Sequence, residues 1–391
     1  MEPMRYVRTW MAVAGLAAIA LFSSPAGAQR SGKGYFVYFG TYTRNVGKGI
    51  YAYRFDPATG RLTSMGLAAE TPSPAFLVVH PNGRFLYAAN EHDGEDTPGK
   101  NNTVSAFAID PVTGKLTFLN KVSSGGEGPC YVSMDRGGRT LLVANYRSGS
   151  VAALPIQRDG RLRDATAFDQ HPDPPADPAP TRPHVHGVVP SPDDRFALAA
   201  DPPLDRVYVY RFDPAKGTLA PNDPAFVQLG LALGPRHLVF GPSGTYVYVN
   251  DEQGSAISTF AYQAAKGTLK EIQTLSTLPA GFSGRSATAE VHIDRAGRFL
   301  YVSNRGHDSI AIFSIDQAKG TLRLVDHAPA GGKTPRYFAF DPSGRFLMVA
   351  NQNSASVVVN RVDVKTGRLT PVQTLTDIPE PVCIVFVPAV G

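Results

Sequence analysis

The chain has 391 residues, of which 43% are hydrophobic and 18% are charged, and its 38 glycines and 33 prolines indicate many turns. Its 21 phenylalanines and 16 tyrosines supply enough apolar surface for a large core, so the composition excludes an intrinsically disordered chain. The formal net charge is only +5 and the basic residues are spread along the chain, so we expect no nucleic-acid partner.

The N-terminus has the pattern of a secretory signal peptide. Arg5 and Arg8 precede an unbroken apolar run over residues 11–22, and Ala26-Gly27-Ala28 is a small-residue cleavage site. The run is too short for a convincing membrane span, although a retained anchor is the alternative. We therefore predict a signal peptide over residues 1–28, one domain over residues 29–391, and no membrane span after cleavage. The expected location is periplasmic or secreted.

Two turns then recur along the rest of the chain. The first follows an apolar strand about every 50 residues, and its middle residues are Gly83, Gly138, Asp194, Gly244, Gly297 and Gly344. The second is an x-Gly-x-Leu turn that occurs seven times, at Gly60, Gly114, Gly160, Gly217, Gly267, Gly320 and Gly367. Glycine suits both turns because tight hairpins need a residue at positive φ.

This repeat predicts an all-β fold. Apolar residues alternate with a period of two over residues 208–212 and 311–315, as expected for strands, and long helical periodicity is absent. A period near 50 with four short strands per unit is typical of a β-propeller blade. We predict seven blades, each a four-stranded antiparallel sheet.

The ends of the chain predict how the ring closes. Residues 35–41, 50–55 and 62–68 supply only three strands before the first complete repeat, and residues 381–388 resemble the missing inner strand. We expect the C-terminal strand to join the N-terminal blade and so protect sheet edges that would otherwise be open.

Numbering each blade from the middle of its first turn makes positions comparable within this one sequence. The inner strand starts near position −8 and the next strand ends near +8, so both ends meet at one rim of the ring. Position −8 reads Ala75, Cys130, His186, Arg236, Ala289 and Arg336. Position +8 reads Glu91, Tyr146, Pro202, Glu252, Arg305 and Gln352. Charged and histidine residues that break the repetition on one rim indicate a functional site.

Position +7 is uniformly small and polar: Asn90, Asn145, Asp201, Asp251, Asn304 and Asn351. Such a column favours an architectural role, in which the side chains cap strand ends through bonds to the main chain. We also keep Asn304 and Asn351, with Arg336, Glu91 and Tyr146, as candidate substrate-binding residues because they share the rim.

Blades 4 to 6 carry the candidate catalytic residues: His184, His186, Arg236, Glu252 and Arg305. Opening an ester ring needs a proton-transfer group and a cation where the carbonyl oxygen becomes negative, which histidine and arginine can supply. The alternative is a set of buried salt bridges that lock neighbouring blades. By strand parity His292 faces away from Arg236, so we expect it to be a packed core histidine.

Metal and thiol chemistry are less favoured. His184 and His186 lie at i and i+2 and could share a divalent ion, but flanking arginines would repel it and no carboxylates cluster there. Oxygen ligands of the +7 column could hold calcium. Cys130 and Cys383 differ in phase within non-adjacent blades, so we predict no disulfide between them. Residues 91–102 and 171–183 could cover the rim.

Several motifs together resemble the lactonase family of seven-bladed propellers, which includes bacterial 6-phosphogluconolactonases and the fungal carboxymuconate-lactonizing enzyme. The resemblance covers about residues 34–388, and its motifs begin at His184, Gly234, Ala289, Ser303 and Ala350. It implies lactone chemistry without a required metal or cofactor, on a small-molecule lactone, with a histidine, two arginines and a glutamate. These fall on the His184/His186 segment, Arg236, Arg305 and Glu252; we expect a monomer.

Two departures bear on the substrate. Asp251 stands where the family pattern has asparagine, which adds negative charge beside Glu252, and Pro202 and Pro203 stiffen the rim of blade 4. The family implies a 6-phosphogluconolactone-type substrate, whereas these departures and the signal peptide weigh against it and introduce an unphosphorylated aldonolactone as the other expected substrate. Lactone formation by a cycloisomerase, and a non-catalytic exported binding module, remain alternatives.

Overall fold

A computed structural model describes residue 1 and residues 34–91, 102–173 and 182–390. Contacts divide the chain into Met1–Ser31 and Gly32–Gly391, and the fold described below is that of the second unit. The predicted signal peptide and most of the two predicted rim segments lie outside the described residues. Among the residues that are described, no helix is long and apolar enough to cross a membrane.

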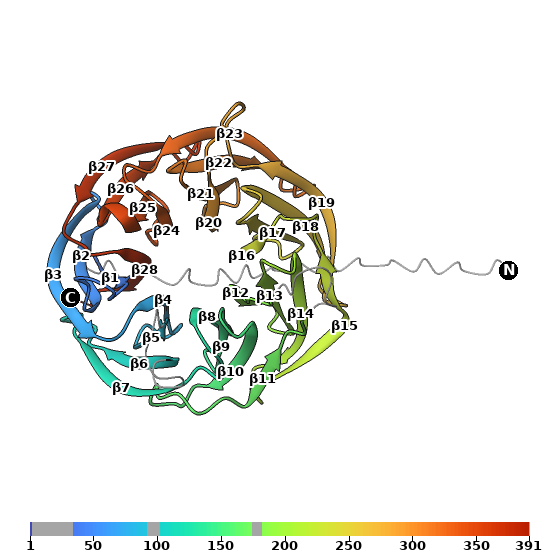
Figure 1. Ribbon diagram of the computed structural model, residues 1–391, viewed down its shortest axis with the longest axis horizontal. Helices are drawn as coiled ribbons and strands as arrows, with labels where there is room; N and C mark the ends of the chain where they lie inside the picture. The colour runs from blue at the N-terminus through green and yellow to red at the C-terminus, as the bar shows by residue number, and fades with distance from the viewer. Residues whose placement is uncertain (2–33, 92–101, 174–181, 391) are drawn as a thin grey trace. The chain divides into compact units, whose positions relative to one another are not determined.

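Seven four-stranded antiparallel sheets are arranged in a ring, which confirms the predicted propeller (Figure 1). Blade 1 contains β28 (Pro381–Pro388), β1 (Tyr35–Thr41), β2 (Gly49–Asp56) and β3 (Arg61–Glu70). Blade 2 contains β4 (Pro74–Val79), β5 (Phe85–Asn90), β6 (Thr103–Ile109) and β7 (Leu116–Ser123). Blade 3 contains β8 (Pro129–Met134), β9 (Thr140–Asn145), β10 (Ser150–Pro155) and β11 (Ala167–Gln170).

The remaining four blades repeat this order from the inside of the ring outward. Blade 4 contains β12 (Gly187–Pro190), β13 (Phe196–Asp201), β14 (Arg206–Asp213) and β15 (Thr218–Gln228). Blade 5 contains β16 (Pro235–Phe240), β17 (Tyr246–Asp251), β18 (Ala256–Gln263) and β19 (Thr268–Ser276). Blade 6 contains β20 (Ala287–Ile293), β21 (Phe299–Arg305), β22 (Ser309–Ile315) and β23 (Leu322–Pro329). Blade 7 contains β24 (Pro335–Phe340), β25 (Phe346–Asn351), the 3-10 turn η1 (Gln352–Ser354), β26 (Ser356–Val362) and β27 (Leu369–Leu375).

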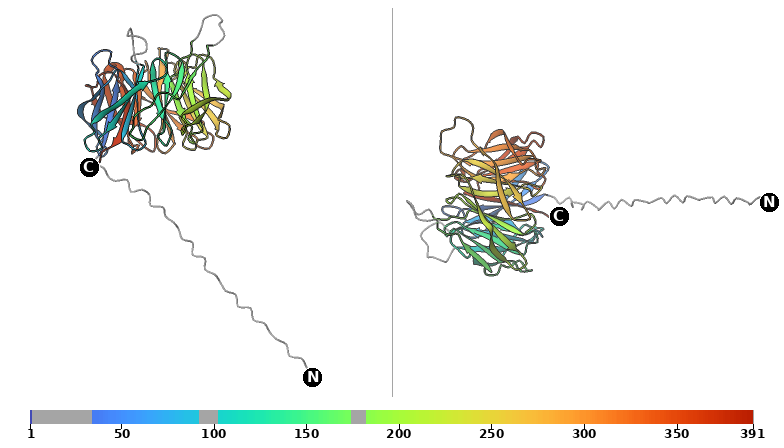
Figure 2. Two further views of the ribbon diagram at one scale, coloured as in Figure 1. Left: turned by 90° about the horizontal axis from the view of Figure 1, so that it is seen from below. Right: turned by 90° about the vertical axis from the view of Figure 1, so that its right-hand side faces the viewer.

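The ring closes as the sequence predicts. Strand β28 pairs antiparallel with β1 from Tyr35 opposite Pro388 to Thr41 opposite Pro381, so the two ends of the chain share blade 1. In Figure 1 the red C-terminal strand lies beside the blue N-terminal strands. Figure 2 shows the ring edge on, with the strands running between its two faces. In each blade the start of the inner strand and the end of the second strand therefore lie at the same face of the ring.

Burial follows the position of a strand in its blade. Every residue of β5, β9, β13 and β25 is buried, because these second strands are covered by neighbouring blades on both sides. The outermost strands, such as β27, alternate between exposed and partly buried residues. Buried, largely apolar second strands and more polar outer strands are what a ring of radially stacked sheets requires.

The second-turn glycines fit against the preceding blade. A Cβ atom on Gly114 would lie 2.5 Å from the Phe36 ring, and one on Gly160 would lie 2.3 Å from the Phe85 ring. The Tyr38 hydroxyl donates to the Gly114 carbonyl at 2.7 Å. The recurring glycine therefore does more than make a turn: in six of the seven blades it allows close approach to an aromatic ring of the preceding blade, and Gly217 of blade 4 meets Thr166 instead.

Six of the seven inner strands have a bulge near their start, whereas β12 pairs with β13 without a register shift. In blade 5 the pairing steps from Pro235 opposite Asp251 to His237 opposite Asn250, so Arg236 is the extra residue. Comparable register shifts occur in β4, β8, β20, β24 and β28. A bulge turns its extra residue away from the regular alternation. Residues at both −8 and −7 can therefore face the centre of the ring.

Candidate active site

Glu252 binds two arginines at the rim. Its Oε1 lies 2.5 Å from Nη2 of Arg305, and its Oε2 lies 3.5 Å from Nε of Arg236. Arg305 also donates to the Thr288 carbonyl at 2.9 Å, and Arg236 donates to the Ala289 carbonyl. The bulge in β16 and the ends of β17 and β21 place these groups together. The predicted grouping of Arg236, Glu252 and Arg305 is present in the structure.

Glu252 and the two arginines are charged although they are largely shielded from water. Burial opposes the charged form of Glu252, but Arg236 and Arg305 outweigh it and hold the pKa of that carboxyl below its ordinary value. Burial lowers the pKa of Arg236 to about 10 although Glu252 opposes the change, so the guanidinium stays charged near neutral pH. Glu252 thus offsets part of the positive charge gathered at this rim.

A second arginine–glutamate pair lies on the opposite side of the rim. Nη2 of Arg336 is 3.9 Å from Oε2 of Glu91, which also accepts a hydrogen bond from the Tyr42 hydroxyl at 2.7 Å. The Arg336 guanidinium lies 5.3 Å from the centre of the Tyr42 ring. We call Arg236, Arg305, Arg336, Glu91 and Glu252 the arginine rim.

His184 is held against Tyr146. Its Nδ1 lies 2.7 Å from the Tyr146 carbonyl oxygen, its ring stacks on the Tyr146 ring at 4.6 Å, and its amide donates to Asp201. A carbonyl oxygen only accepts, so Nδ1 of His184 carries a proton and donates it in this hydrogen bond. His184 is half-buried.

His186 lies deeper, at the inner end of blade 4. It is only 6% exposed, and its Nδ1 lies 3.2 Å from Nε2 of His237 and 3.8 Å from the Cys130 sulfur. Burial, helped by the charges of Arg236 and Arg336, holds its pKa well below the usual value. The imidazole is therefore neutral near pH 7 and can accept a proton.

A small pocket joins these groups. Its volume is about 10 Å³, close to the space that one water molecule needs. The residues that line it come mainly from positions −8 and −7 of the inner strands: Ala75, Phe76, Cys130, His186, Arg236, His237, Arg336, Tyr337 and Val382. The neutral His186 and the two arginines, Arg236 and Arg336, therefore surround a pocket about the size of one water molecule.

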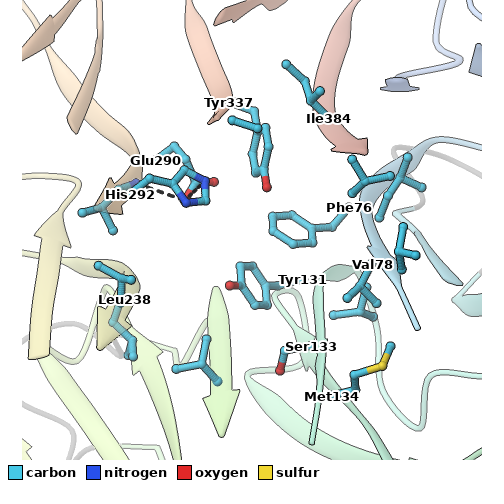
Figure 3. A pocket seen from close by; sticks show the side chains of 18 of the residues that line it. Phe76, Val78, Tyr131, Ser133, Met134, Leu238, Glu290, His292, Tyr337 and Ile384 are labelled. Atoms are coloured by element: carbon cyan, nitrogen blue, oxygen red, sulfur yellow. Dashed lines mark hydrogen bonds and ion pairs between the residues drawn. The ribbon is translucent and has the colours of Figure 1, made fainter. Parts of the chain in front are cut away.

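An aromatic floor separates this pocket from a larger cavity in the channel. The Phe76 ring lies 4.0 Å from Tyr131 and 5.5 Å from Tyr337, and the Tyr131 ring lies 4.8 Å from His237. Beyond them is a cavity of about 670 Å³, here called the channel cavity, with mostly apolar walls. In Figure 3 the rings of Phe76, Tyr131 and Tyr337 converge near its centre, and Glu290 and His292 lie at its edge.

The expectation that His292 is a packed core histidine is wrong. Its side chain is 32% exposed and lines the channel cavity, 3.9 Å from Glu290. The parity argument failed because the bulge in β20 interrupts the alternation between position −8 and the rest of the strand. Surrounding protein desolvates the ring and lowers its pKa to about 4.

Asn304 and Asn351, the two asparagines predicted as candidate binding residues, form hydrogen bonds to the main chain, as expected for a structural role. Asn304 donates to the Thr277 carbonyl at 2.9 Å, and Asn351 donates to the Ala330 carbonyl at 3.1 Å; both residues are fully buried. Each hydrogen bond joins the end of a second strand to the segment that leads from the preceding blade into the same blade. Cys130 and Cys383 are both buried, and both are free cysteines.

Sequence comparison between blades missed two buried groups, His237 and Glu290. Both occupy position −7, beside Arg236 and Ala289, and regular alternation would have turned that position away from the rim. Position −7 otherwise holds Phe76, Tyr131, Gly187 and Tyr337, so the two ionisable residues in this column were the available signal. Within the described ranges, no group of three or more histidine, cysteine, aspartate or glutamate residues is placed to hold a metal ion.

Comparison with known families agrees with this fold. The family model described as "Lactonase, 7-bladed beta-propeller" matches residues 36–386. The chain therefore belongs to the lactonase family of seven-bladed β-propellers, and it is a lactone hydrolase.

Named relatives span nearly the whole of this chain. A 6-phosphogluconolactonase of Bacillus subtilis is 34% identical over 90% of this chain and 98% of the relative. The periplasmic gluconolactonase PpgL of Pseudomonas aeruginosa has a solved structure that superposes with a TM-score of 0.85, at 36% identity, over 91% of this chain and 99% of its own. A putative 6-phosphogluconolactonase of Bacteroides fragilis gives a TM-score of 0.82 at 31% identity, over 93% of this chain and 100% of that one.

Proposed function

We propose that this lactonase hydrolyses an unphosphorylated aldonolactone of the glucono-1,5-lactone type at the arginine rim. The observation that carries the proposal is the convergence of a neutral histidine, His186, with Arg236 and Arg336 around one small pocket. Relatives are named for two kinds of substrate, gluconolactone and its 6-phospho form. The charge balance of the rim supports the first.

Each arginine of the rim already has a carboxylate within ion-pair distance. Glu252 lies 3.5 Å from Arg236 and 2.5 Å from Arg305, and Glu91 lies 3.9 Å from Arg336. Three guanidinium groups and two carboxylates leave one positive charge in excess. That excess matches a carbonyl oxygen that gains a single negative charge, whereas a phosphate dianion would need more unpaired charge.

The residues divide the chemistry between them. His186 takes a proton from water as the water oxygen attacks the lactone carbonyl, and the resulting oxyanion lies against Arg305 and Arg336, whose side chains are each 17% exposed. Arg236 lies behind them and adds its charge. The tetrahedral intermediate then breaks its bond to the ring oxygen, which receives a proton from His186. The product is the open-chain hydroxy acid.

The test is turnover of a lactone panel by the purified protein, with and without EDTA. The panel contains glucono-1,5-lactone, 6-phosphogluconolactone and an aromatic-derived muconolactone. Arg305→Ala should lower kcat/KM for the preferred lactone by at least ~100-fold, because it removes a donor to the oxyanion. A His184→Ala/His186→Ala double variant should be inactive, whereas Arg211→Ala, which changes an exposed arginine on β14, should match the wild type.

Each alternative gives a different result. Unchanged turnover by folded Arg305→Ala would contradict the arginine-rim mechanism, and a preference for the 6-phospho substrate would contradict the charge argument. Loss of activity in EDTA would require a metal. If no lactone is turned over, the propeller is better explained as a binding module.

We also propose that the protein acts in the periplasm. The predicted signal peptide over residues 1–28 supports this location, and so does the periplasmic gluconolactonase among the structural relatives. An exported enzyme would meet free sugar lactones rather than phosphorylated metabolic intermediates, which agrees with the substrate proposed above.

A further inference from the structure

We propose that His237 and Glu290 are positioning residues that set the proton-accepting form of His186, through a hydrogen-bonded chain running from the rim pocket to the channel cavity. The inference rests on the proposed function, because it assigns roles behind the same histidine. It concerns two residues that do not touch the substrate.

The chain consists of three side chains in line. Nδ1 of His186 lies 3.2 Å from Nε2 of His237, and Nδ1 of His237 lies 3.2 Å from Oε2 of Glu290. The main-chain amide of Val291 donates to the other carboxyl oxygen at 3.0 Å and fixes its orientation. His237 thus uses both ring nitrogens: Nε2 faces His186 and Nδ1 faces the carboxyl group of Glu290.

Burial prevents water from replacing these contacts. His237 and Glu290 have side chains only 4% and 5% exposed, and the aromatic floor surrounds them. Nη1 of Arg236 lies within 3.3 Å of both ring nitrogens of His237, and its positive charge disfavours a protonated imidazole there. Burial and that charge hold the pKa of His237 well below its usual value. Both histidines are therefore neutral, and each has one N–H and one lone pair.

The charge of Glu290 decides which nitrogen carries the proton. An ionised Glu290 only accepts, so His237 donates from Nδ1 and His186 donates from Nδ1 to Nε2 of His237. Nε2 of His186 then presents a lone pair to the pocket. A protonated Glu290 donates instead, which reverses both hydrogen bonds and turns Nε2 of His186 into a donor. One form accepts the proton of attacking water, and the other returns a proton to the leaving ring oxygen.

The hydrogen-bonded chain from His186 to Glu290 can also carry away the proton that the reaction releases. Hydrolysis of a lactone near neutral pH yields a carboxylate and releases one proton. After His186 has returned the proton of water to the ring oxygen, its Nε2 takes the proton of the carboxylic acid product. The Nδ1 proton of His186 then moves to His237, and the Nδ1 proton of His237 moves to Glu290. Because Glu290 lines the channel cavity (Figure 3), that proton can leave on the side of the floor away from the bound substrate.

Several titratable groups surround Glu290. Those that face it from the packed strands are His237, His292, Tyr131, Tyr337, Cys383, Arg236 and Arg336. Burial is the largest influence and raises the pKa of Glu290 to about 8, against the lowering effects of the Val291 amide and the two arginines. The form that accepts a proton from water therefore accumulates as the pH rises through about 8.

The test compares pH profiles of kcat/KM on glucono-1,5-lactone between pH 6 and 9, with the uncatalysed rate subtracted. The wild type should rise to a plateau with an inflection near 8. Glu290→Gln, which keeps the shape but cannot ionise, should lose the inflection and lower kcat by about 100-fold while KM stays within about twofold. Glu290→Asp should keep an inflection and recover part of kcat.

The controls separate this inference from loss of fold and from the proposed function. His237→Asn interrupts the hydrogen bonds between His186 and Glu290. It should therefore give the same loss of the inflection in the pH profile, and it tests the proposal even if Glu290→Gln fails to fold. His292→Gln, on the same strand and facing the channel cavity, should keep the wild-type profile. If folded Glu290→Gln and His237→Asn both keep the wild-type pH profile, the proposed positioning role of His237 and Glu290 is overturned. If Arg305→Ala were inactive at the same time, the proposed lactonase site would stand without it.

Discussion

The surroundings of Asp251 make its carboxyl group less negatively charged near neutral pH than an ordinary aspartate. It occupies position +7, where four other blades have asparagine, and it lies directly before Glu252. Ser258 donates to one carboxyl oxygen at 2.7 Å, while the other is buried without a hydrogen-bond partner among the described residues. Burial raises its pKa to about 7, so at and below neutral pH it adds much less negative charge beside the rim than its sequence suggests.

This raised pKa predicts a pH-dependent stability difference. The Asp251 carboxyl binds its proton more tightly in the folded chain, at about 7, than at its ordinary value of 3.8, so the free energy of unfolding falls as the pH rises through that window. Asp251→Asn cannot ionise and should escape the fall. Between pH 5 and pH 8 the wild type should lose roughly 2 kcal/mol relative to the variant.

Urea unfolding of both proteins at pH 5 and pH 8 measures this difference. Equal differences between the variant and the wild type at the two pH values would mean that Asp251 does not titrate in this window. Activity of Asp251→Asn then reports separately whether the carboxyl matters to the rim.

The site residues that the sequence identified share one property: each stands at a strand end where the repeat is broken. Arg236, Glu252 and Arg305 were found because the column comparison needs only the spacing of the turns. His237 and Glu290 were missed because their direction depends on a bulge, and no residue type in the inner strands marks its place. The contact between His186 and His237 therefore could not be predicted from spacing.

At the level of elements, two glycines of blade 2 allow a controlled comparison. Gly83 and Gly114 both have positive φ, near 70°, but they differ in what surrounds them. A Cβ atom on Gly83 would have nothing within 4 Å, whereas one on Gly114 would lie 2.5 Å from the Phe36 ring of the preceding blade. The two positions thus share backbone strain and differ in the contact between blades.

Alanine at these positions should give unequal losses of stability. Gly83→Ala should lower the free energy of unfolding by about 1 kcal/mol, from backbone strain alone. Gly114→Ala should lose about 1–3 kcal/mol more, because the ring or the blade must move. Chemical denaturation of the two variants beside the wild type measures both values. Equal losses would show that the Phe36 contact does not hold blades 1 and 2 together.

At the scale of the whole molecule, the ring brings together residues from distant parts of the chain. Glu91 of blade 2 lies 3.9 Å from Arg336 of blade 7, and Glu252 of blade 5 lies 2.5 Å from Arg305 of blade 6. Closure by β28 makes the first pair possible, because it places blades 2 and 7 on either side of blade 1.

The predicted export belongs to the same scale. If residues 1–28 are a cleaved signal peptide, the protein recovered from the periplasmic fraction of its host should begin at Gln29. N-terminal sequencing of that fraction, with a cytoplasmic marker enzyme as the control, measures both location and cleavage. Recovery of the uncleaved chain in the membrane fraction would instead indicate a retained anchor.

The repeat was readable without coordinates because turn chemistry and strand alternation are local. Glycines at fixed intervals and apolar second strands suffice to predict seven blades, the closure by residues 381–388 and the rim on which Arg236, Glu252 and Arg305 meet. The aromatic floor, the channel cavity and the chain from His186 to Glu290 required the tertiary structure. They depend on bulges and on side chains of different blades meeting at the axis, where contacts come from ring geometry rather than from neighbours in sequence.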